Sequence, residues 1–143
     1  MKWNWQRVTL AVVDGFAAIS AIGGGYAVMA GIIKPGTDLA AGPFSWLISD
    51  YFVAGALLLV VTGGTALAAL VAMLLSRTAG AGFSAAAGLV MMGWIASEVV
   101  LVGPHWLQAI YFAVGLAMLA VALMVEPGQM RATAHRLRLP DGS

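Results

Sequence analysis

The sequence predicts an all-α integral membrane protein, a four-helix bundle with both termini in the cytoplasm. The first observation is composition: of 143 residues, 62% are hydrophobic and only 9% are charged, and the mean hydropathy is +0.95. Soluble domains contain about 25% charged residues, so this chain has too few charges to cover a water-facing surface. The second observation is a series of four apolar segments, and the third is the placement of the basic residues.

Each apolar segment is long enough to cross the hydrocarbon core as a helix, which takes about 20 residues. The four expected spans cover residues 8–33, 50–75, 81–102 and 105–125. Strands with open edges are excluded in lipid, because their backbone polar groups would find no partner. A short loop at 76–80 and a tight turn at Gly103-Pro104 make the last three spans an antiparallel meander, and the first span closes the bundle.

Basic residues gather on one side of the expected membrane. With four spans, both termini and the loop at 76–80 share a side, and Lys34 is the only basic residue on the other. By the positive-inside rule the first side is cytoplasmic, so we expect a multi-pass protein of the cytoplasmic membrane with both ends inside. The basic residues of this side are Lys2, Arg7, Arg77, Arg131, Arg136 and Arg138.

The chain divides into a bundle over residues 1–126 and a basic cytoplasmic tail over residues 127–143. Pro127 and Gly128, after Glu126, predict the end of the fourth span. In the tail, apolar and basic residues repeat at helical spacing, which is typical of a helix lying on an anionic membrane surface. A frayed basic tail is the alternative. The repeating residues are Met130, Ala134 and Leu137, beside Arg131, His135 and Arg138.

Small residues at a spacing of four predict the faces on which the helices pack, because membrane helices associate through close backbone approach. A run of three glycines in the first span predicts either another such face or a hinge near a ligand. The rows are Gly64-Ala68-Ala72, Gly80-Ser84-Gly88 and Ala113-Ala117, and the run is Gly23-Gly24-Gly25.

Glu98 is the stronger of two acidic candidates inside the spans, where an ionisable side chain is costly and marks a functional site by default. Counting across the turn places Gln108 and Tyr111 within one helical turn of its depth. These residues predict an apolar cup that opens to the outside and holds a small molecule or a proton. The alternative is a buried carboxyl that bonds Gln108 or Tyr111 and only fixes the helix register. The expected cup is completed by Trp94, His105 and Asp50.

Asp14 is the second intramembrane acid, and its own helix offers no hydrogen-bonding side chain three or four residues away. We expect Arg7, Arg77 or Arg131 to reach it and form a structural ion pair. A role as a transport carboxylate is the alternative.

Two members of the expected cup have simpler interpretations. Asp50 lies at the start of the second span, where its side chain would cap the helix. His105 lies in the expected turn, where a histidine is commonly solvated.

His135 lies on the other side of the membrane from His105, so a haem held by two histidines is not expected. The absence of cysteine excludes iron–sulfur clusters, and no metal site is expected. A net charge of +1 argues against nucleic acid as a partner.

Three segments carry a family resemblance: Ser49-Asp50-Tyr51-Phe52, residues 93–100 (GWIASEVV) and residues 106–112 (WLQAIYF). Together they resemble small four-span bacterial membrane proteins of the DoxX-like type. The resemblance implies an association with membrane oxidoreductases and a quinone-like ligand near Glu98, Trp94 and Tyr111. Small multidrug resistance proteins also have four helices and an acid in the first span. This chain departs from them through its length, its extended first loop and Glu98.

These observations favour a protein of the bacterial inner membrane that binds an apolar, lipid-like or quinone-like molecule in an outward-facing cup. Membrane lipids are its expected surroundings, and it would serve as a homo-oligomer or as an accessory subunit of a larger membrane complex. The alternative is a proton-coupled transporter that acts as an oligomer through Glu98 and Asp14. An enzyme is less favoured, because the sequence contains no redox centre and no nucleophile with a base beside it.

Overall fold

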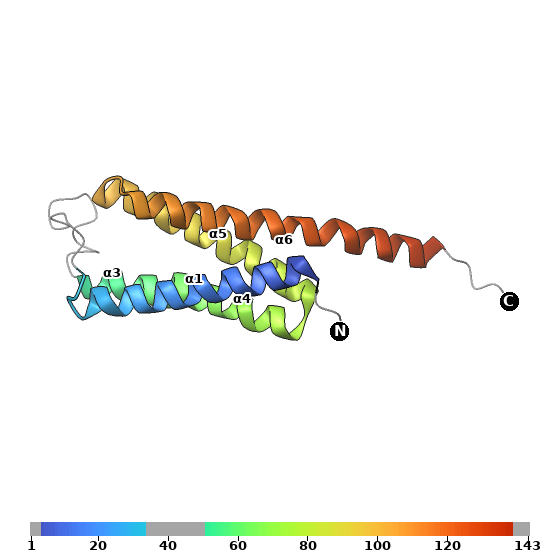
Figure 1. Cartoon of the computed structure of the whole chain (residues 1–143), viewed down its shortest axis with the longest axis horizontal. Helices are drawn as coiled ribbons and strands as arrows, with labels where there is room; N and C mark the ends of the chain where they lie inside the picture. Colours follow the sequence, from blue (N-terminus) through green and yellow to red (C-terminus); the bar gives the residue numbers. More distant parts are fainter. Residues whose placement is uncertain (1–3, 34–50, 139–143) are drawn as a thin grey trace.

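The structure is a computed structural model that describes residues 4–33 and 51–138, and this part of the chain contains helices and no strands (Figure 1). Four of its stretches are long and apolar enough to cross a membrane, which confirms the predicted helical class and the four spans. The helices are α1 (Trp5–Met29), α3 (Tyr51–Leu57), η2 (Leu58–Gly63), α4 (Gly64–Leu75), α5 (Arg77–Val102) and α6 (Trp106–Arg138).

The helices form two antiparallel pairs that share one long axis (Figure 1). One pair is α1 with the continuous run α3–η2–α4, and the other is α5 with α6; α4 also packs against α5. Large apolar side chains cover the outside, and Ile19, Leu75 and Val100 are each 77% exposed. Such a surface suits lipid, where exposed apolar groups carry no hydrophobic penalty.

Each pair is held by a reciprocal contact between two glycines. A Cβ atom on Gly25 would lie 2.6 Å from the carbonyl oxygen of Gly55, and one on Gly55 would lie 2.5 Å from that of Gly25. Gly88 and Gly115 make the same kind of contact between α5 and α6, at 2.6 and 2.9 Å. Because only glycine allows this approach, Gly25 acts as a packing position, as one interpretation of the glycine run expected.

The second span contains a π-helical segment, η2, that the hydropathy pattern did not predict. In a π-helix the hydrogen bonds run to the fifth residue, so the turn is wider and the regular bonding is shifted. The Thr65 hydroxyl donates to the carbonyl oxygens of Val61 at 2.7 Å and of Thr62 at 3.1 Å, and so satisfies carbonyls inside the altered turn.

Three helix ends differ from the expected ones. Ser76 alone separates α4 from α5, because its side chain caps α5 by accepting from the backbone N–H of Ala79, so the expected loop at 76–80 is wrong. The first helix ends at Met29, just before Gly31, whose φ of 71° suits glycine. The fourth helix does not end at Glu126 but continues through Pro127 to Arg138, although a proline inside a helix removes one hydrogen bond and crowds the preceding turn.

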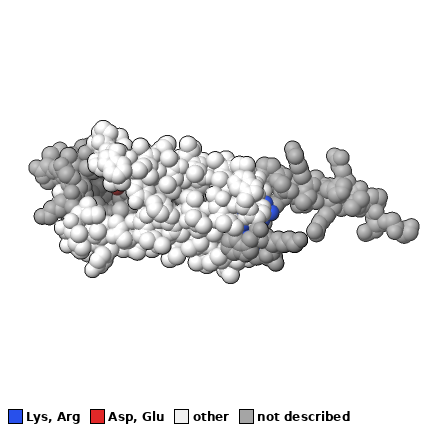
Figure 2. All heavy atoms as spheres, in the orientation of Figure 1, with Lys and Arg blue, Asp and Glu red and all other residues white. Residues whose placement is uncertain are grey.

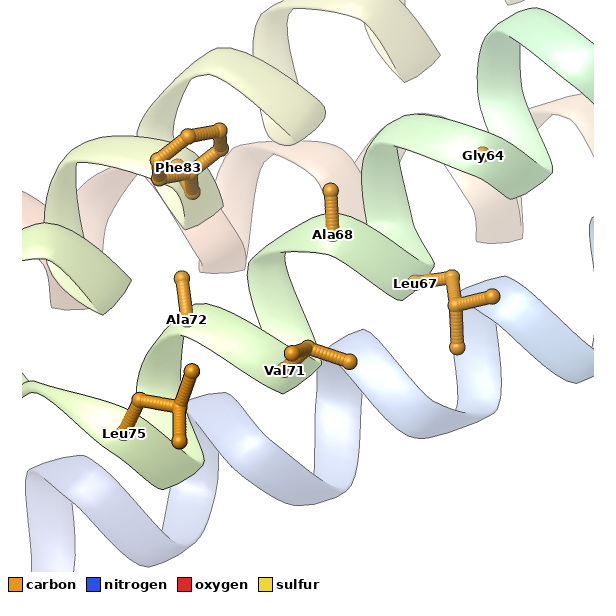
Figure 3. Close-up of a pocket in the computed structure, with 7 residues that line it drawn as sticks. All are labelled: Gly64, Leu67, Ala68, Val71, Ala72, Leu75 and Phe83. Carbon is orange, nitrogen blue, oxygen red and sulfur yellow. The ribbon is translucent and has the colours of Figure 1, made fainter.

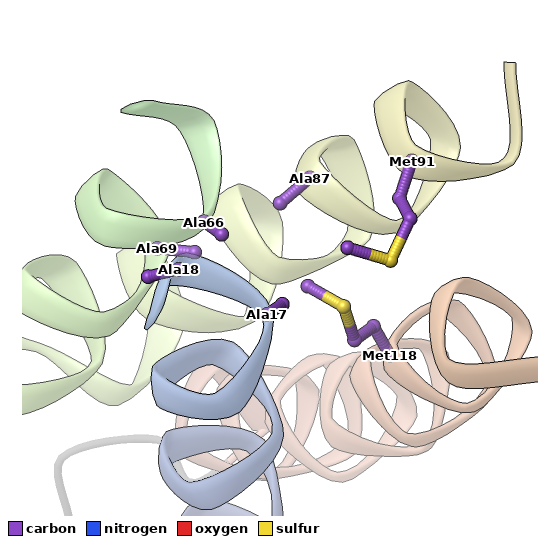
Figure 4. Close-up of a cluster of buried hydrophobic side chains, with 7 residues drawn as sticks. All are labelled: Ala17, Ala18, Ala66, Ala69, Ala87, Met91 and Met118. Atoms are coloured by element: carbon purple, nitrogen blue, oxygen red, sulfur yellow. The ribbon is translucent and has the colours of Figure 1, made fainter. Parts of the chain in front are cut away.

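The interior is built from alanine and methionine. One cluster at mid-bundle contains Ala17 and Ala18 of α1, alanines of α4 and α5, and two methionines whose side chains extend toward each other, Met91 and Met118 (Figure 4). Small side chains let the backbones approach, and the flexible methionines fill the remaining space. A second cluster lies toward the start of α1 and contains Leu10, Met73, Ala81, Ala122 and Val125.

Of the predicted packing rows, only the one on α5 is confirmed in full. Gly80 lies against Met73, Ser84 is buried and Gly88 lies against Gly115. The other two rows were wrong, because these helices pack through different faces. The row on α4 instead lines an open apolar groove with Phe83 (Figure 3), and the α6 row is exposed. The groove is lined by Gly64, Leu67, Ala68, Val71, Ala72, Leu75 and Phe83.

Candidate functional site

The site with the strongest functional character is centred on Glu98, close to the end of α5. One helical turn before it, Trp94 projects from the same face, and its indole Nε1–H donates to the Glu98 carboxylate at 2.7 Å. Both side chains are half-buried. The sequence expectation that Trp94 and Glu98 belong to one cluster agrees with this geometry.

Gln108 joins this pair from the start of α6. Gln108 is 8% exposed, and its side-chain oxygen Oε1 accepts a hydrogen bond from the backbone N–H of His105 at 2.7 Å. The amide also hydrogen-bonds the Glu98 side chain. Since the amide oxygen is already engaged and a carboxylate only accepts, the Gln108 NH2 group is the donor to Glu98. One residue therefore caps α6 and ties α6 to the acid of α5.

His105 lies in the turn between the two helices rather than on the acid. Its ring nitrogen Nδ1 accepts from the backbone N–H of Leu107 at 3.3 Å, and its ring lies 5.7 Å from that of Trp106 at a tilt of 35°. Both rings are exposed. His105 thus acts as a turn and capping residue, which was the simpler of its two interpretations. Asp50, another expected member of the cup, lies outside the described residues.

Tyr111 faces α1 and not Glu98 of α5, where it was expected. Its ring stacks on Phe16 of α1, with centroids 6.3 Å apart and planes inclined by 16°, and it packs against the mid-bundle cluster. Glu98 takes its hydrogen bonds from Trp94 and Gln108 instead. The structure therefore uses Tyr111 as a contact between the two helix pairs.

Asp14 is sealed inside the bundle, with no exposed surface. The Ser84 hydroxyl of α5 donates to its Oδ2 atom at 2.5 Å, and its Oδ1 atom has no hydrogen-bond partner. The expected ion pair with Arg7 or Arg77 was wrong, and the side chain of Arg131 lies outside the described residues. Ser84 stands in the predicted row Gly80-Ser84-Gly88, so that row was the signal that could have identified it.

Arg7 does not form the expected ion pair with Asp14. Its side chain is almost completely buried, with 1% of the residue surface exposed. Its guanidinium donates to the backbone carbonyl of Met73 at 2.8 and 3.1 Å and to that of Leu74 at 2.9 Å. Carbonyls at the end of a helix have no partner within the helix, so Arg7 supplies one to α4. Arg77 donates to the Gln6 side chain at 2.9 Å.

Charge is confined to the two ends of the described surface. Figure 2 shows uncharged residues along the length of the bundle, with red at one end and blue at the other. Within the described residues, the end with Glu98 is also where the two helix pairs make the fewest contacts, because α3 packs on α1 but hardly touches α5 or α6. Among the described residues, no cluster of three His, Cys, Asp or Glu side chains could hold a metal ion.

Comparison of the chain with family models, with curated proteins and with solved structures gives no match. The chemistry of the site therefore rests on its own residues. These provide a carboxylate with two N–H donors, an indole beside it and apolar helices around them. Such a combination can hold the polar head of a largely apolar molecule.

Proposed function

We propose that this protein is a four-span protein of the bacterial inner membrane that binds a small, largely apolar molecule at Glu98. The observation that carries the proposal is the hydrogen-bonded set of Trp94, Glu98 and Gln108. It combines a half-exposed carboxylate with apolar surroundings near the end of the α5–α6 hairpin. Mostly apolar sites with a few convergent polar groups are typical of small-molecule binding.

The excess of basic residues at the termini and at Arg77 supports an orientation with both ends in the cytoplasm. Glu98 then lies toward the outer face, where a molecule that partitions into the membrane would reach it. A lipid-like or quinone-like ligand and a role as an accessory subunit accord with the DoxX-like resemblance, and they are part of the proposal on that ground alone.

A proton-coupled transporter is supported less well by this geometry. Such a mechanism needs both intramembrane acids to reach water in turn. Glu98 is half-exposed, but Asp14 has no exposed surface and is held by Ser84 across the bundle. The two acids therefore differ in access, and only Glu98 suits a ligand site.

Native mass spectrometry of the gently extracted protein tests the proposal, since it reports bound small molecules and partner chains together. We compare the wild type with Glu98→Gln, and with Asp14→Asn as the matched loss of the other acid. The expected result is a retained molecule in the wild type and in Asp14→Asn that is absent from Glu98→Gln. No retained molecule in any form, or equal retention in all three, would leave Glu98 with a structural role.

A further inference from the structure

We infer that the molecule bound at Glu98 carries a positive charge, so that the site selects lipophilic cations of the quaternary ammonium or phosphonium class. This inference rests on the proposed function and narrows the ligand class from apolar molecules in general to cationic ones. Three observations support it: the partners of Glu98, the direction of the hydrogen-bond donors, and the neighbouring aromatic ring.

Both hydrogen-bond partners of Glu98 are neutral groups, the indole of Trp94 and the amide of Gln108. The two arginines whose side chains the structure describes serve the opposite end of the bundle, where Arg7 bonds Met73 and Arg77 bonds Gln6. No lysine or arginine side chain within the described residues therefore balances Glu98, and the ring of His105, in the nearby turn, is engaged with the backbone N–H of Leu107. A carboxylate in apolar surroundings without a counter-charge is costly, and a bound cation supplies that charge.

The direction of the donors disfavours a neutral ligand that only accepts hydrogen bonds. A quinone presents carbonyl oxygens and needs N–H or O–H donors. The Trp94 indole N–H already points to Glu98, and the Gln108 amide is engaged by Glu98 on one side and by His105 on the other. A glutamine amide has two N–H groups, so the second N–H of Gln108 remains as a donor, and the main group that the site offers to a ligand is the carboxylate, which accepts. An oxygen-bearing acceptor would meet another acceptor, whereas a cation would be attracted.

The aromatic neighbour favours the same class of ligand. Trp94 keeps its ring beside the carboxylate through the 2.7 Å hydrogen bond and is half-buried. The face of an indole attracts large, weakly hydrated cations, more strongly than any other side-chain ring. A carboxylate and an indole held side by side can therefore bind a lipophilic cation, because the carboxylate attracts its charge and the indole contacts its apolar groups.

The test uses probes that share a size and differ in charge. The full chain is purified in an uncharged detergent, and equilibrium dialysis measures the binding of tetraphenylphosphonium and of tetraphenylborate, which have nearly the same shape. Tetrabutylammonium serves as a smaller cation, and decylubiquinone serves as the neutral probe. We expect the wild type to bind at least one of the cations, and to bind it at least tenfold more tightly than the anion or the quinone.

Three variants show which carboxylate is responsible for cation binding. Glu98→Gln should weaken cation binding at least tenfold, and Glu98→Asp, which keeps the charge, should retain most of it. Asp14→Asn removes the sealed acid and should leave binding unchanged. Size-exclusion profiles and helical circular dichroism establish that each variant is folded, so a loss of binding is not a loss of structure.

The outcomes separate the inference from the proposed function. Decylubiquinone binding that depends on Glu98, with no cation bound, would overturn the cationic class and leave the proposed function standing. Cation binding that is unchanged in Glu98→Gln would overturn the inference, because the charge would then act elsewhere. If no probe binds, the inference fails, and native mass spectrometry of the wild type decides the proposed function by itself.

Discussion

The two halves of this bundle use polar side chains in opposite ways. In the half where α1 begins, Arg7 bonds Met73 near the end of the bundle and Asp14 bonds Ser84 closer to its middle, across 66 and 70 residues of sequence. Both partnerships are buried and join different helices. At the other end, Trp94 bonds Glu98 across four residues, and the side chains are half-buried.

The difference shows how a chain with few charges divides its polar groups between stability and binding. Long-range buried hydrogen bonds fix the arrangement of helices, because breaking one leaves a polar group unsatisfied in apolar surroundings. The hydrogen bonds around Glu98 stay within one hairpin, so they can rearrange around a ligand without separating the helix pairs. Substitutions at buried residues, each with a less buried residue of the same type as its control, and at Glu98 can test this comparison.

The largest expected effect is on Arg7. Arg7→Met should lower the free energy of unfolding by about 2–4 kcal/mol, since it leaves two helix-end carbonyls without their donor and each unsatisfied buried carbonyl costs about 1–3 kcal/mol. The control is Arg77→Met, which loses one hydrogen bond to Gln6 at a half-buried position and should cost about 1 kcal/mol or less. Unfolding by SDS in mixed micelles measures both. Equal losses would show that burial of Arg7 adds nothing to stability.

A smaller loss is expected at Ser84. Ser84→Ala should cost about 1–3 kcal/mol, because Asp14 would then remain buried without a hydrogen-bond partner. Ser97 of the same helix provides the control, since its exposed hydroxyl bonds only the Gly93 carbonyl one turn earlier. Ser97→Ala should change stability by less than about 0.5 kcal/mol. Similar values for the two variants in the same SDS titration would refute a locking role for the Asp14–Ser84 pair.

The smallest expected effect on stability is at Glu98. Glu98→Gln should change the free energy of unfolding by less than about 1 kcal/mol, because the new amide oxygen can still accept from Trp94 and the site is half-exposed. The measurement is the same SDS titration, carried out on protein without ligand. A loss of stability as large as that of Ser84→Ala would show that Glu98 also stabilises the arrangement of the helices, and the contrast between the two halves of the bundle would disappear.

The sequence was sufficient for the features that depend on local spacing. Four apolar runs predicted the four spans, and a spacing of four residues placed Trp94 beside Glu98. Counting across the Gly103-Pro104 turn placed Gln108 at the right depth, because only residues 103–105 separate α5 from α6. These predictions need only the helical repeat and the length of one turn.

The long-range partnerships could not be obtained in the same way. Asp14 meets Ser84, and Tyr111 meets Phe16, only because of the way each helix is rotated in the bundle. In lipid the outward and inward faces of a helix are both apolar, so hydropathy does not fix this rotation. The row that contains Gly64 has the same spacing as the row that contains Gly88, yet only the second is packed. The wider turn of η2 also leaves no signal in the hydropathy pattern.

The pairing of Asp14 with Ser84 has a consequence for the order in which the protein is made. A ribosome that adds about 5–20 residues per second needs roughly 4–14 seconds to synthesise the 70 residues that separate the two. During this interval the first span holds a carboxyl group whose partner has not yet been synthesised. The nascent chain therefore passes through a stage in which Asp14 must rely on water or on the insertion machinery. Arrival of the third span ends this stage and joins the first helix to the second hairpin.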